Sequence, residues 1–274
     1  MKHLRRLPLF LVMVFASSAV MATGATEGSI DSLMELSGLN KQIEAIPAGI
    51  TGGIKSGLQQ GAQLSKEQYT QIETAAFQAF QPEKISAAIS SKLMQTLSEA
   101  ETQKLLSWYR SDLGKKITQA EAQASKPAAY QAMVNQAKSL LADKERVNMA
   151  LRIDKLVNAS EMSLEFQKST ATAVYTSLVK AKQPEKPVDI EAFNAQLAKE
   201  ETKLLQQVKQ FVVLSFVYTY KDIADADMEQ YLDFLAQPET RKFNDNAIGA
   251  MQRVLSDSVK EMGEPLGKIF TAKR

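Results

Sequence analysis

Residues that commonly perform catalysis are scarce in this chain of 274 residues, which contains no Cys and a single His, His3. His3 lies in an N-terminal segment, residues 1–22, that has the features of a secretory signal peptide, so the mature chain is expected to contain neither His nor Cys. A Ser-His-Asp triad, a Cys-His pair, thiol redox chemistry and zinc sites built on imidazole or thiolate are therefore excluded. The chemistry that remains open is that of paired carboxylates or of a Ser-Lys dyad.

Among the carboxylates, Asp225 and Asp227 are a candidate pair, but both fall where the first turn of a helix is predicted. The helix dipole favours negative charge in that turn, which explains the two residues without catalysis. A Ser-Lys dyad cannot be recognised from spacing, because its partners must meet in space. We therefore name no catalytic residue, and a hydrolase-type enzyme using carboxylates or a Ser-Lys dyad is the alternative to a non-enzymatic protein.

The segment 49–56, GITGGIKS, approaches the phosphate-binding pattern G-x-x-x-x-G-K-S. Ile54 occupies the position of the second required Gly, and no strand is predicted before the segment. Four glycines recur here at every fourth residue: Gly49, Gly53, Gly57 and Gly61. On a helix this spacing forms a ridge of small residues. The segment is therefore predicted to be helical, and no cofactor or metal site is expected.

One stretch of the chain occurs twice. Residues 97–117, LSEAETQKLLSWYRSDLGKKI, align without a gap with residues 223–243, IADADMEQYLDFLAQPETRKF, which lie 126 positions later. Three aligned positions are identical: Ala100/Ala226, Leu106/Leu232 and Lys116/Lys242. Eight further positions keep their physical type, so the pattern indicates a degenerate internal repeat.

Each copy is predicted to be two helices joined at a corner. Ser98 with Glu101 forms the pattern of a capping box, which starts the first helix. Ser111 can cap the second helix, and in the other copy Pro238 suits the first helical position. Ala224 replaces the capping Ser98, so the second copy is expected to be less well capped.

Aromatic and basic residues recur at these corners. Trp108 and Tyr109 lie at helical spacing on an apolar face, so we expect them in the core, with stacking on a ligand as the alternative. The basic residues just past the corners are Lys115, Lys116, Arg241 and Lys242. A solvated surface explains them most simply. Contact with an anion or a partner protein is the alternative, and these four are the candidate contact residues.

The pattern aromatic-Tyr-x-Ser-Pro-x-Gly-x-Lys on a helical corner resembles the bacterial envelope family catalogued as domain of unknown function 2059. The first copy supplies Trp108, Tyr109, Ser111, Gly114 and Lys116, with Asp112 where Pro is usual. The second supplies Phe234, Pro238 and Lys242, and departs at Leu235, Gln237 and Thr240. The resemblance implies an all-helical fold, present here as two copies, behind a signal peptide. It implies no catalytic or ligand-binding residues.

The signal peptide is predicted from Lys2, Arg5 and Arg6 followed by an apolar run, residues 7–16, and then small residues. Cleavage is expected after Ala22, or alternatively after Ala19. An uncleaved membrane anchor is less favoured, because the apolar run is shorter than the ~18 to 20 residues that span a bilayer. Cleavage leaves the chain within one charge of neutrality, which argues against nucleic-acid binding.

Three further features predict helix positions. Residues 30–46 are expected to form one helix that Pro47 ends or restarts, and residues 263–265 are expected to end the last long helix. The apolar run 211–218 could be a buried strand by composition. Its alignment with a helical segment of the first copy favours a buried helix instead.

Together these features predict an all-α protein, a helical bundle or array built from two tandem degenerate helical repeats after a cleaved signal peptide. The repeats are expected to span residues 23–142 and 143–274 and to pack as one unit. We predict a non-enzymatic exported protein of the bacterial periplasm that binds an envelope protein or an apolar ligand. No nucleic acid partner and no stable membrane span after signal cleavage are expected.

Overall fold

The computed structural model describes residues 23–59, 65–183, 185 and 187–271. Within these ranges the regular elements are helices, accompanied by one isolated β-bridge between Gly24 and Ser98, so the predicted all-α fold is confirmed. The predicted signal peptide, residues 1–22, lies outside the described residues. The helices are α1 (Glu27–Leu36), α2 (Leu39–Gln59), α3 (Lys66–Ala79), α4 (Pro82–Thr96), α5 (Glu99–Arg110), α6 (Asp112–Ala124), α7 (Pro127–Leu140), α8 (Lys144–Val157), α9 (Ala159–Lys182), α10 (Ile190–Thr219), α11 (Asp225–Ala236) and α12 (Pro238–Thr271).

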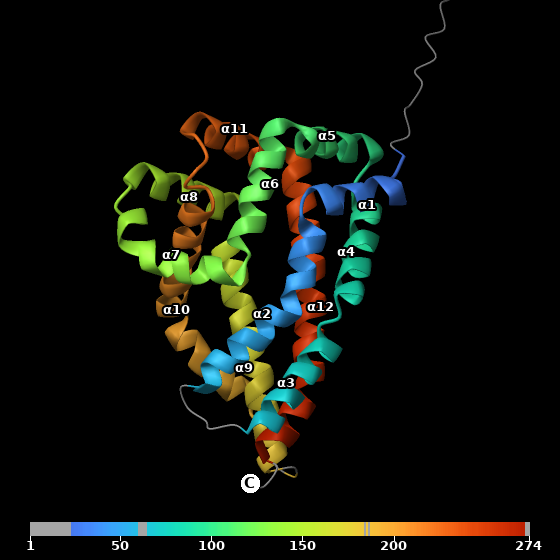
Figure 1. Cartoon of the computed structure of the whole chain (residues 1–274). Helices are drawn as coiled ribbons and strands as arrows, with labels where there is room; N and C mark the ends of the chain where they lie inside the picture. Colours follow the sequence, from blue (N-terminus) through green and yellow to red (C-terminus); the bar gives the residue numbers. More distant parts are fainter. Residues whose placement is uncertain (1–22, 60–64, 184, 186, 272–274) are drawn as a thin grey trace, which may run out of the picture.

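The helix α12 organises the bundle. In Figure 1, α5 and α11 lie across one end of the molecule, and α12 runs from that end to the opposite one. Along its length α12 packs against α9, α4 and α3. Because α3 and α4 precede residue 142 and α9 follows it, one hydrophobic core draws side chains from both predicted repeats. The most deeply buried residues of this core lie in the first half, among them Leu33, Ile85, Ile89, Leu93 and Leu105.

The two corners form as their capping residues predict. Ser98 and Glu101 make a complete capping box at the start of α5. The Ser111 hydroxyl accepts a hydrogen bond from the Gly114 amide, 3.0 Å away, at the start of α6. The helix α12 begins at Pro238, whereas α11 begins after Ala224 without a side-chain cap. The second corner is therefore less well capped, as expected.

Two predicted helix boundaries are wrong near the N-terminal end. The expected helix 30–46 is divided, because α1 ends at Leu36 and Gly38 adopts a positive φ of 76° that breaks the helix. The helix α2 then continues through Pro47 to Gln59. In Figure 1, α2 changes direction partway along its length, which is the usual effect of a proline inside a helix.

The predicted end of the last helix is also wrong. The helix α12 continues through Pro265 to Thr271. Met262 and Ile269, which flank the proline, are both buried, and the Ile269 carbonyl accepts a hydrogen bond from the Gln68 side chain of α3. Burial on both sides of Pro265 offsets a cost of about 3 kcal/mol for a proline within a helix.

The apolar run 211–218 lies in α10, so the helical alternative is confirmed and the strand is not formed. Val212, Val213 and Val217 are buried, but Phe211 keeps 48% of its surface exposed. Only one face of this part of α10 therefore packs inward.

Candidate ligand cavity

The four basic residues predicted as contact residues take two kinds of position. Lys116 Nζ lies 2.8 Å from Asp227 Oδ2, and Lys242 Nζ lies 2.9 Å from Glu101 Oε1. The other two, Lys115 and Arg241, are exposed. Two of the four residues thus bind carboxylates of the same chain, although Lys116 is exposed as well.

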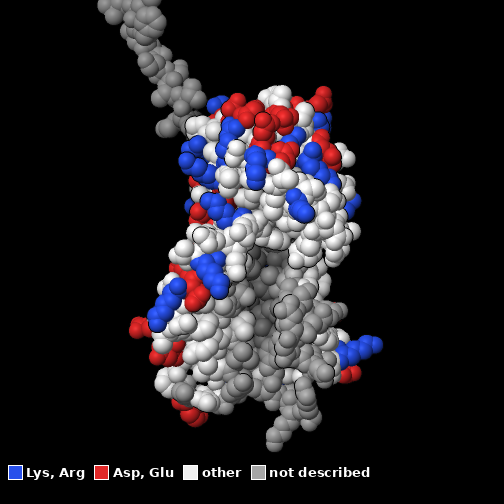
Figure 2. All heavy atoms as spheres, turned by 90° about the vertical axis from the view of Figure 1, so that its left-hand side faces the viewer, with Lys and Arg blue, Asp and Glu red and all other residues white. Residues whose placement is uncertain are grey.

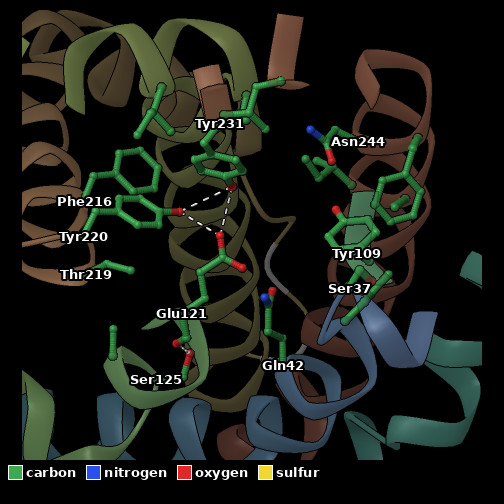
Figure 3. A pocket seen from close by; sticks show the side chains of 18 of the residues that line it. Ser37, Gln42, Tyr109, Glu121, Ser125, Phe216, Thr219, Tyr220, Tyr231 and Asn244 are labelled. Atoms are coloured by element: carbon green, nitrogen blue, oxygen red, sulfur yellow. Dashed lines mark hydrogen bonds between the residues drawn. The ribbon is translucent and has the colours of Figure 1, made fainter. Parts of the chain in front are cut away.

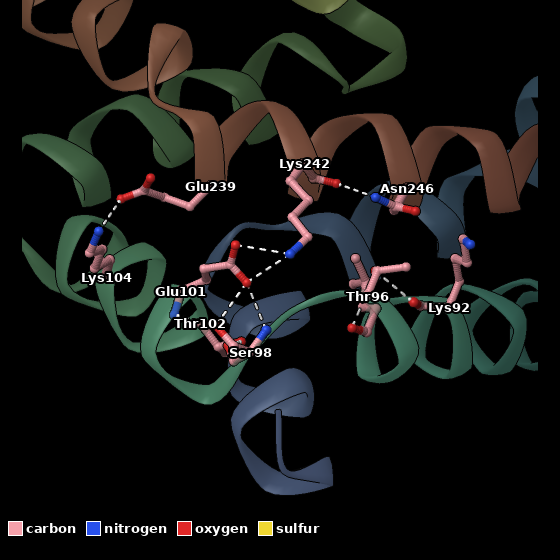
Figure 4. Close-up of polar contacts among 10 residues, drawn as sticks. Lys92, Thr96, Ser98, Glu101, Thr102, Lys104, Glu239, Lys242 and Asn246 are labelled. Carbon is pink, nitrogen blue, oxygen red and sulfur yellow. Dashed lines mark hydrogen bonds and ion pairs between the residues drawn. The ribbon is translucent and has the colours of Figure 1, made fainter. Parts of the chain in front are cut away.

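Glu101 joins the two corners through several contacts at once. Its carboxylate accepts hydrogen bonds from the Ser98 amide, 2.8 Å away, and from Lys242 Nζ, which reaches it from α12 (Figure 4). The backbone hydrogen bond from Ser98 is the main cause that lowers the pKa of Glu101 to about 2, and Lys242 adds to the effect. Lys104 and Glu239 make a further ion pair between α5 and α12 at 3.2 Å.

Aromatic rings fill the space between the corners. Trp108 of α5 stacks on Phe234 of α11, with ring centroids 4.3 Å apart and an angle of 7° between the planes. Tyr109 meets Phe234 edge to face at 5.7 Å. Both side chains are partly buried and pack against the hydrophobic core through these ring contacts, as predicted. The exposed side of Tyr109, however, borders the cavity described next.

Beside the aromatic contacts lies a cavity of about 380 Å³. Its size falls within the range of about 300–1,000 Å³ that is usual for small-molecule sites. Helices from both predicted repeats form its walls, and the lining residues are Ser37, Leu39, Gln42, Tyr109, Glu121, Ala124, Ser125, Ile153, Val157, Phe216, Thr219, Tyr220, Tyr231, Leu235, Phe243, Asn244, Ala247, Ile248 and Met251. Most of this wall is apolar or aromatic.

A carboxyl group and two tyrosines form the polar side of the cavity. The hydroxyl of Tyr220 donates to Glu121 Oε1 over 2.7 Å, and the hydroxyl of Tyr231 donates to the same oxygen over 2.9 Å. The two hydroxyls are themselves 3.4 Å apart. Figure 3 shows this cluster on one side of the open space, with Tyr109 and Asn244 on the other. Among the described residues, the second carboxylate oxygen of Glu121 has no hydrogen-bond partner.

The surroundings of Glu121 disfavour its charge. Loss of hydration raises the pKa of Glu121, and the two tyrosine hydrogen bonds oppose that rise only in part. Burial, and then the charge of Glu121, raise the pKa of Tyr109, Tyr220 and Tyr231 as well. The three phenols therefore remain protonated and can act as hydrogen-bond donors.

Three more polar groups face this space without a partner. Within the described part of the chain, neither the Tyr109 hydroxyl nor the side-chain amides of Gln42 and Asn244 make a hydrogen bond. Gln42 is exposed, and Tyr109 and Asn244 are half-buried, so these three groups are accessible to solvent or to a ligand. An apolar cavity with a few unpartnered polar groups is the arrangement that orients a small ligand.

Sequence reasoning missed the cavity, although one signal was present. Glu121 lies on the apolar stripe of α6, four residues after Ile117 and three before Ala124. A carboxylate on a face that is otherwise apolar indicates a buried polar site. Its partners could not be identified in the same way, because Tyr220 and Tyr231 lie 99 and 110 residues away in the sequence.

Other kinds of site find little support in the described residues. No group of three or more Asp, Glu, His or Cys side chains is placed there to hold a metal ion. None of the helices described has the length and apolar character needed to cross a membrane. Figure 2 shows acidic and basic side chains intermingled on the upper part of the face that it presents.

The comparison with protein families matches the part of the chain that contains the first corner. Residues 83–143 match the family described as an uncharacterized protein conserved in bacteria, domain of unknown function 2059. The match begins in α4, includes α5 and α6, and ends just after α7, so it contains Trp108, Tyr109 and Glu121. No curated protein and no solved structure shows a significant match to the chain. Over residues 83–143, the chain is thus similar to a bacterial family whose description names no activity.

Proposed function

We propose that this chain is a non-enzymatic binding protein of the bacterial periplasm, exported by a signal peptide in residues 1–22, which holds a small and largely apolar molecule in its cavity. The cavity itself carries this proposal, because it is about 380 Å³ in size and has unpartnered polar groups on an apolar wall. A ligand there would bury its apolar body against Phe216, Leu235 and Phe243. Its polar end would meet Glu121 or Tyr109.

The cavity lies between two halves that we propose to be copies of one helical unit. The contacts between the corners support this, because they are reciprocal at the repeat spacing of 126 residues. Lys116 binds Asp227 while the equivalent Lys242 binds the equivalent Glu101. Trp108 stacks on Phe234, which occupies the same position in the other copy. Such an exchange is what an approximate twofold axis between the copies produces.

The hydrolase alternative finds less support at this cavity. The described residues of its lining include one carboxylate, Glu121, and no lysine, whereas the mechanisms considered need two carboxylates or a Ser-Lys pair. The hydroxyls of Ser37 and Ser125 donate to backbone carbonyls at 3.3 and 2.9 Å. Asp225, the candidate partner of Asp227, pairs with Arg146 at 2.8 Å.

Native mass spectrometry of the mature protein tests the proposal. Protein prepared from the periplasm of an expressing bacterium is expected to carry a small molecule that gentle activation releases. Ala124→Phe places a phenyl group in the cavity, and we expect the bound mass to disappear. Ala122→Phe is the matched control, because Ala122 lies on the same helix and does not line the cavity. A wild-type protein free of ligand in every preparation, or equal retention by both variants, would contradict the proposal.

A protein partner is the second candidate, and one exposed apolar cluster favours it. Tyr130 and Val134 of α7 are 58% and 45% exposed, and Phe211 of α10 is 48% exposed. The rings of Tyr130 and Phe211 lie 6.2 Å apart, so the residues form one patch. Pull-down from envelope extract with wild type and with Phe211→Ser tests this role. A partner retained equally by both proteins would place the contact elsewhere.

A further inference from the structure

The charge of the cavity wall narrows the class of ligand. Glu121 is the only residue with an ionisable carboxyl or basic group among the described residues that line it, and the other titratable side chains there are tyrosines. Lys, Arg and His are absent from that lining. A carboxylate or phosphate group entering the cavity would therefore meet no positively charged partner among these residues to offset its loss of hydration.

The ends of the surrounding helices add to this bias. Four helices end at the cavity, and six lining residues are the last residue or the C-cap of one of them: Ser37 of α1, Ala124 and Ser125 of α6, Val157 of α8, and Thr219 and Tyr220 of α10. Of the described helices, only α2 has its first residue, Leu39, in the lining. Because the C-terminal end of a helix is the negative end of its dipole, these helix ends favour a cation over an anion.

Aromatic rings in the cavity wall also favour a positively charged ligand. Tyr109, Phe216, Tyr220, Tyr231 and Phe243 all line the cavity, and aromatic faces attract ammonium and guanidinium groups. The free oxygen of Glu121 lies among these rings, as Figure 3 shows for the labelled tyrosines. A cation there would gain an ionic partner and an aromatic wall together.

We propose that the cavity selects an organic cation, an amine with an apolar body, whose ammonium group binds the free carboxylate oxygen of Glu121. This inference rests on the proposed function, and it specifies the chemical class of the ligand. The hydroxyls of Tyr220 and Tyr231 hold the other oxygen, so the carboxylate is oriented before the ligand arrives. The amides of Gln42 and Asn244 and the hydroxyl of Tyr109 are available to the rest of the ligand.

The proposal includes a link to pH. Burial raises the pKa of Glu121, and the groups that face it are neutral phenols, Tyr109 of α5, Tyr220 after α10 and Tyr231 of α11. A cation requires the ionised carboxylate, so its binding to the protonated form releases one proton from Glu121. The affinity for a cation is therefore expected to increase with pH until Glu121 is ionised without ligand.

Three probes of one shape test the charge preference. Benzylamine, which is cationic at neutral pH, benzyl alcohol and benzoate are titrated into the mature protein and followed by NMR. Benzylamine is expected to bind at least tenfold more tightly than benzyl alcohol, and benzoate is expected to show no saturable binding. The benzylamine affinity should rise between pH 5 and pH 8, while that of benzyl alcohol should stay constant.

Variants separate this inference from the proposed function. Glu121→Gln should lose at least tenfold in affinity for benzylamine and the pH dependence, and it should keep benzyl alcohol binding within about threefold. Glu73→Gln is the control, since it removes one negative charge from the exposed face of α3. Equal binding of amine and alcohol, with both lost in Ala124→Phe, would overturn the charge preference and leave the cavity a ligand site. If none of the three probes binds, and native mass spectrometry detects no ligand, the proposed function itself fails.

Discussion

At the residue scale, Gly114 shows why one position of the first corner cannot carry a side chain. A Cβ atom there would lie 2.1 Å from the carbonyl oxygen of Trp108, which is backbone and cannot rotate away. Gly114→Ala should therefore lower the free energy of unfolding by about 1–3 kcal/mol, as overpacking does. Gly249→Ala is the control, because a Cβ at Gly249 in α12 meets nothing within 4 Å. It should raise stability by about 0.5–1 kcal/mol. Urea denaturation of both variants checks the prediction, and equal midpoints would contradict it.

Glu121 should affect stability in the direction opposite to most carboxylates. Its pKa is raised in the folded state by burial, so its favourable contribution is complete below the unfolded pKa, near 4.3, and is lost as the pH rises through the folded value. Glu121→Gln removes the charge but keeps an oxygen that can accept from Tyr220 and Tyr231. We expect the variant to gain stability relative to wild type as the pH increases from 4 to 8. Denaturant midpoints across this range measure the gain, and a constant difference between the proteins would refute it.

At the element scale, the two corners allow the effect of capping to be measured in both directions. Ser98→Ala removes the capping box of α5 and should cost about 1 kcal/mol. Ala224 occupies the equivalent position before α11, with an extended backbone and no side-chain cap. Ala224→Ser should therefore stabilise the protein by up to about 1 kcal/mol. Thermal denaturation of the two variants should show Tm shifts of opposite sign, and a loss of stability in both would mean that Ala224 is held there by packing.

The start of α5 should also make the fold sensitive to acid. The pKa of Glu99 and that of Glu101 are both about 2 in the folded protein, mainly because of hydrogen bonds from Ser29 and Ser98 respectively. Folded values below the unfolded one mean that this stabilisation is present above about pH 4.5 and is lost as the pH falls toward 2. The denaturant midpoint of wild type should fall in this window. Glu101→Gln should show a smaller fall, and Glu73→Gln should follow wild type. An identical pH profile for Glu101→Gln would exclude this role.

Helix starts were predictable from the sequence, and helix ends were less so. Ser98, Ser111 and Pro238 act within one turn of the chain, so their effects can be recognised locally. Pro47 and Pro265 are also local signals, but neither ends its helix. Burial of residues around them against other helices decides those positions, and a single sequence does not contain that information in local form.

At the scale of the whole molecule, the alignment behind the proposed repeat was the most informative feature of the sequence, and the cavity was the feature that the sequence revealed least. The spacing of 126 residues pairs Trp108 with Phe234 and Lys116 with Lys242, and these are the residues that make the contacts between the corners. The cavity depends on how several helices meet around Glu121. Its volume and its unpartnered oxygen follow from the packing of long-range neighbours, which no periodicity in the sequence encodes.

The contact between the corners should make the two halves unfold together. Trp108 is the only tryptophan of the chain, so its fluorescence reports on the first corner, whereas far-UV circular dichroism reports on all helices. Phe234 belongs to the other corner, is 3% exposed and stacks on Trp108. Phe234→Ala should cost about 3–5 kcal/mol, as large truncations in a core do. If both corners belong to one cooperative unit, the variant should lower the urea midpoint of the two signals equally.

Phe211→Ala provides the control for this experiment, because Phe211 keeps 48% of its surface exposed on α10. Its cost should be within about 0.5 kcal/mol, the usual effect of a surface substitution. Two separate transitions in wild type, or a Phe234→Ala variant that shifts the circular dichroism signal while the fluorescence midpoint stays in place, would show that the halves unfold independently. In that case the stacked rings would join two units that fold separately, and the cavity would be able to open by separation of its walls.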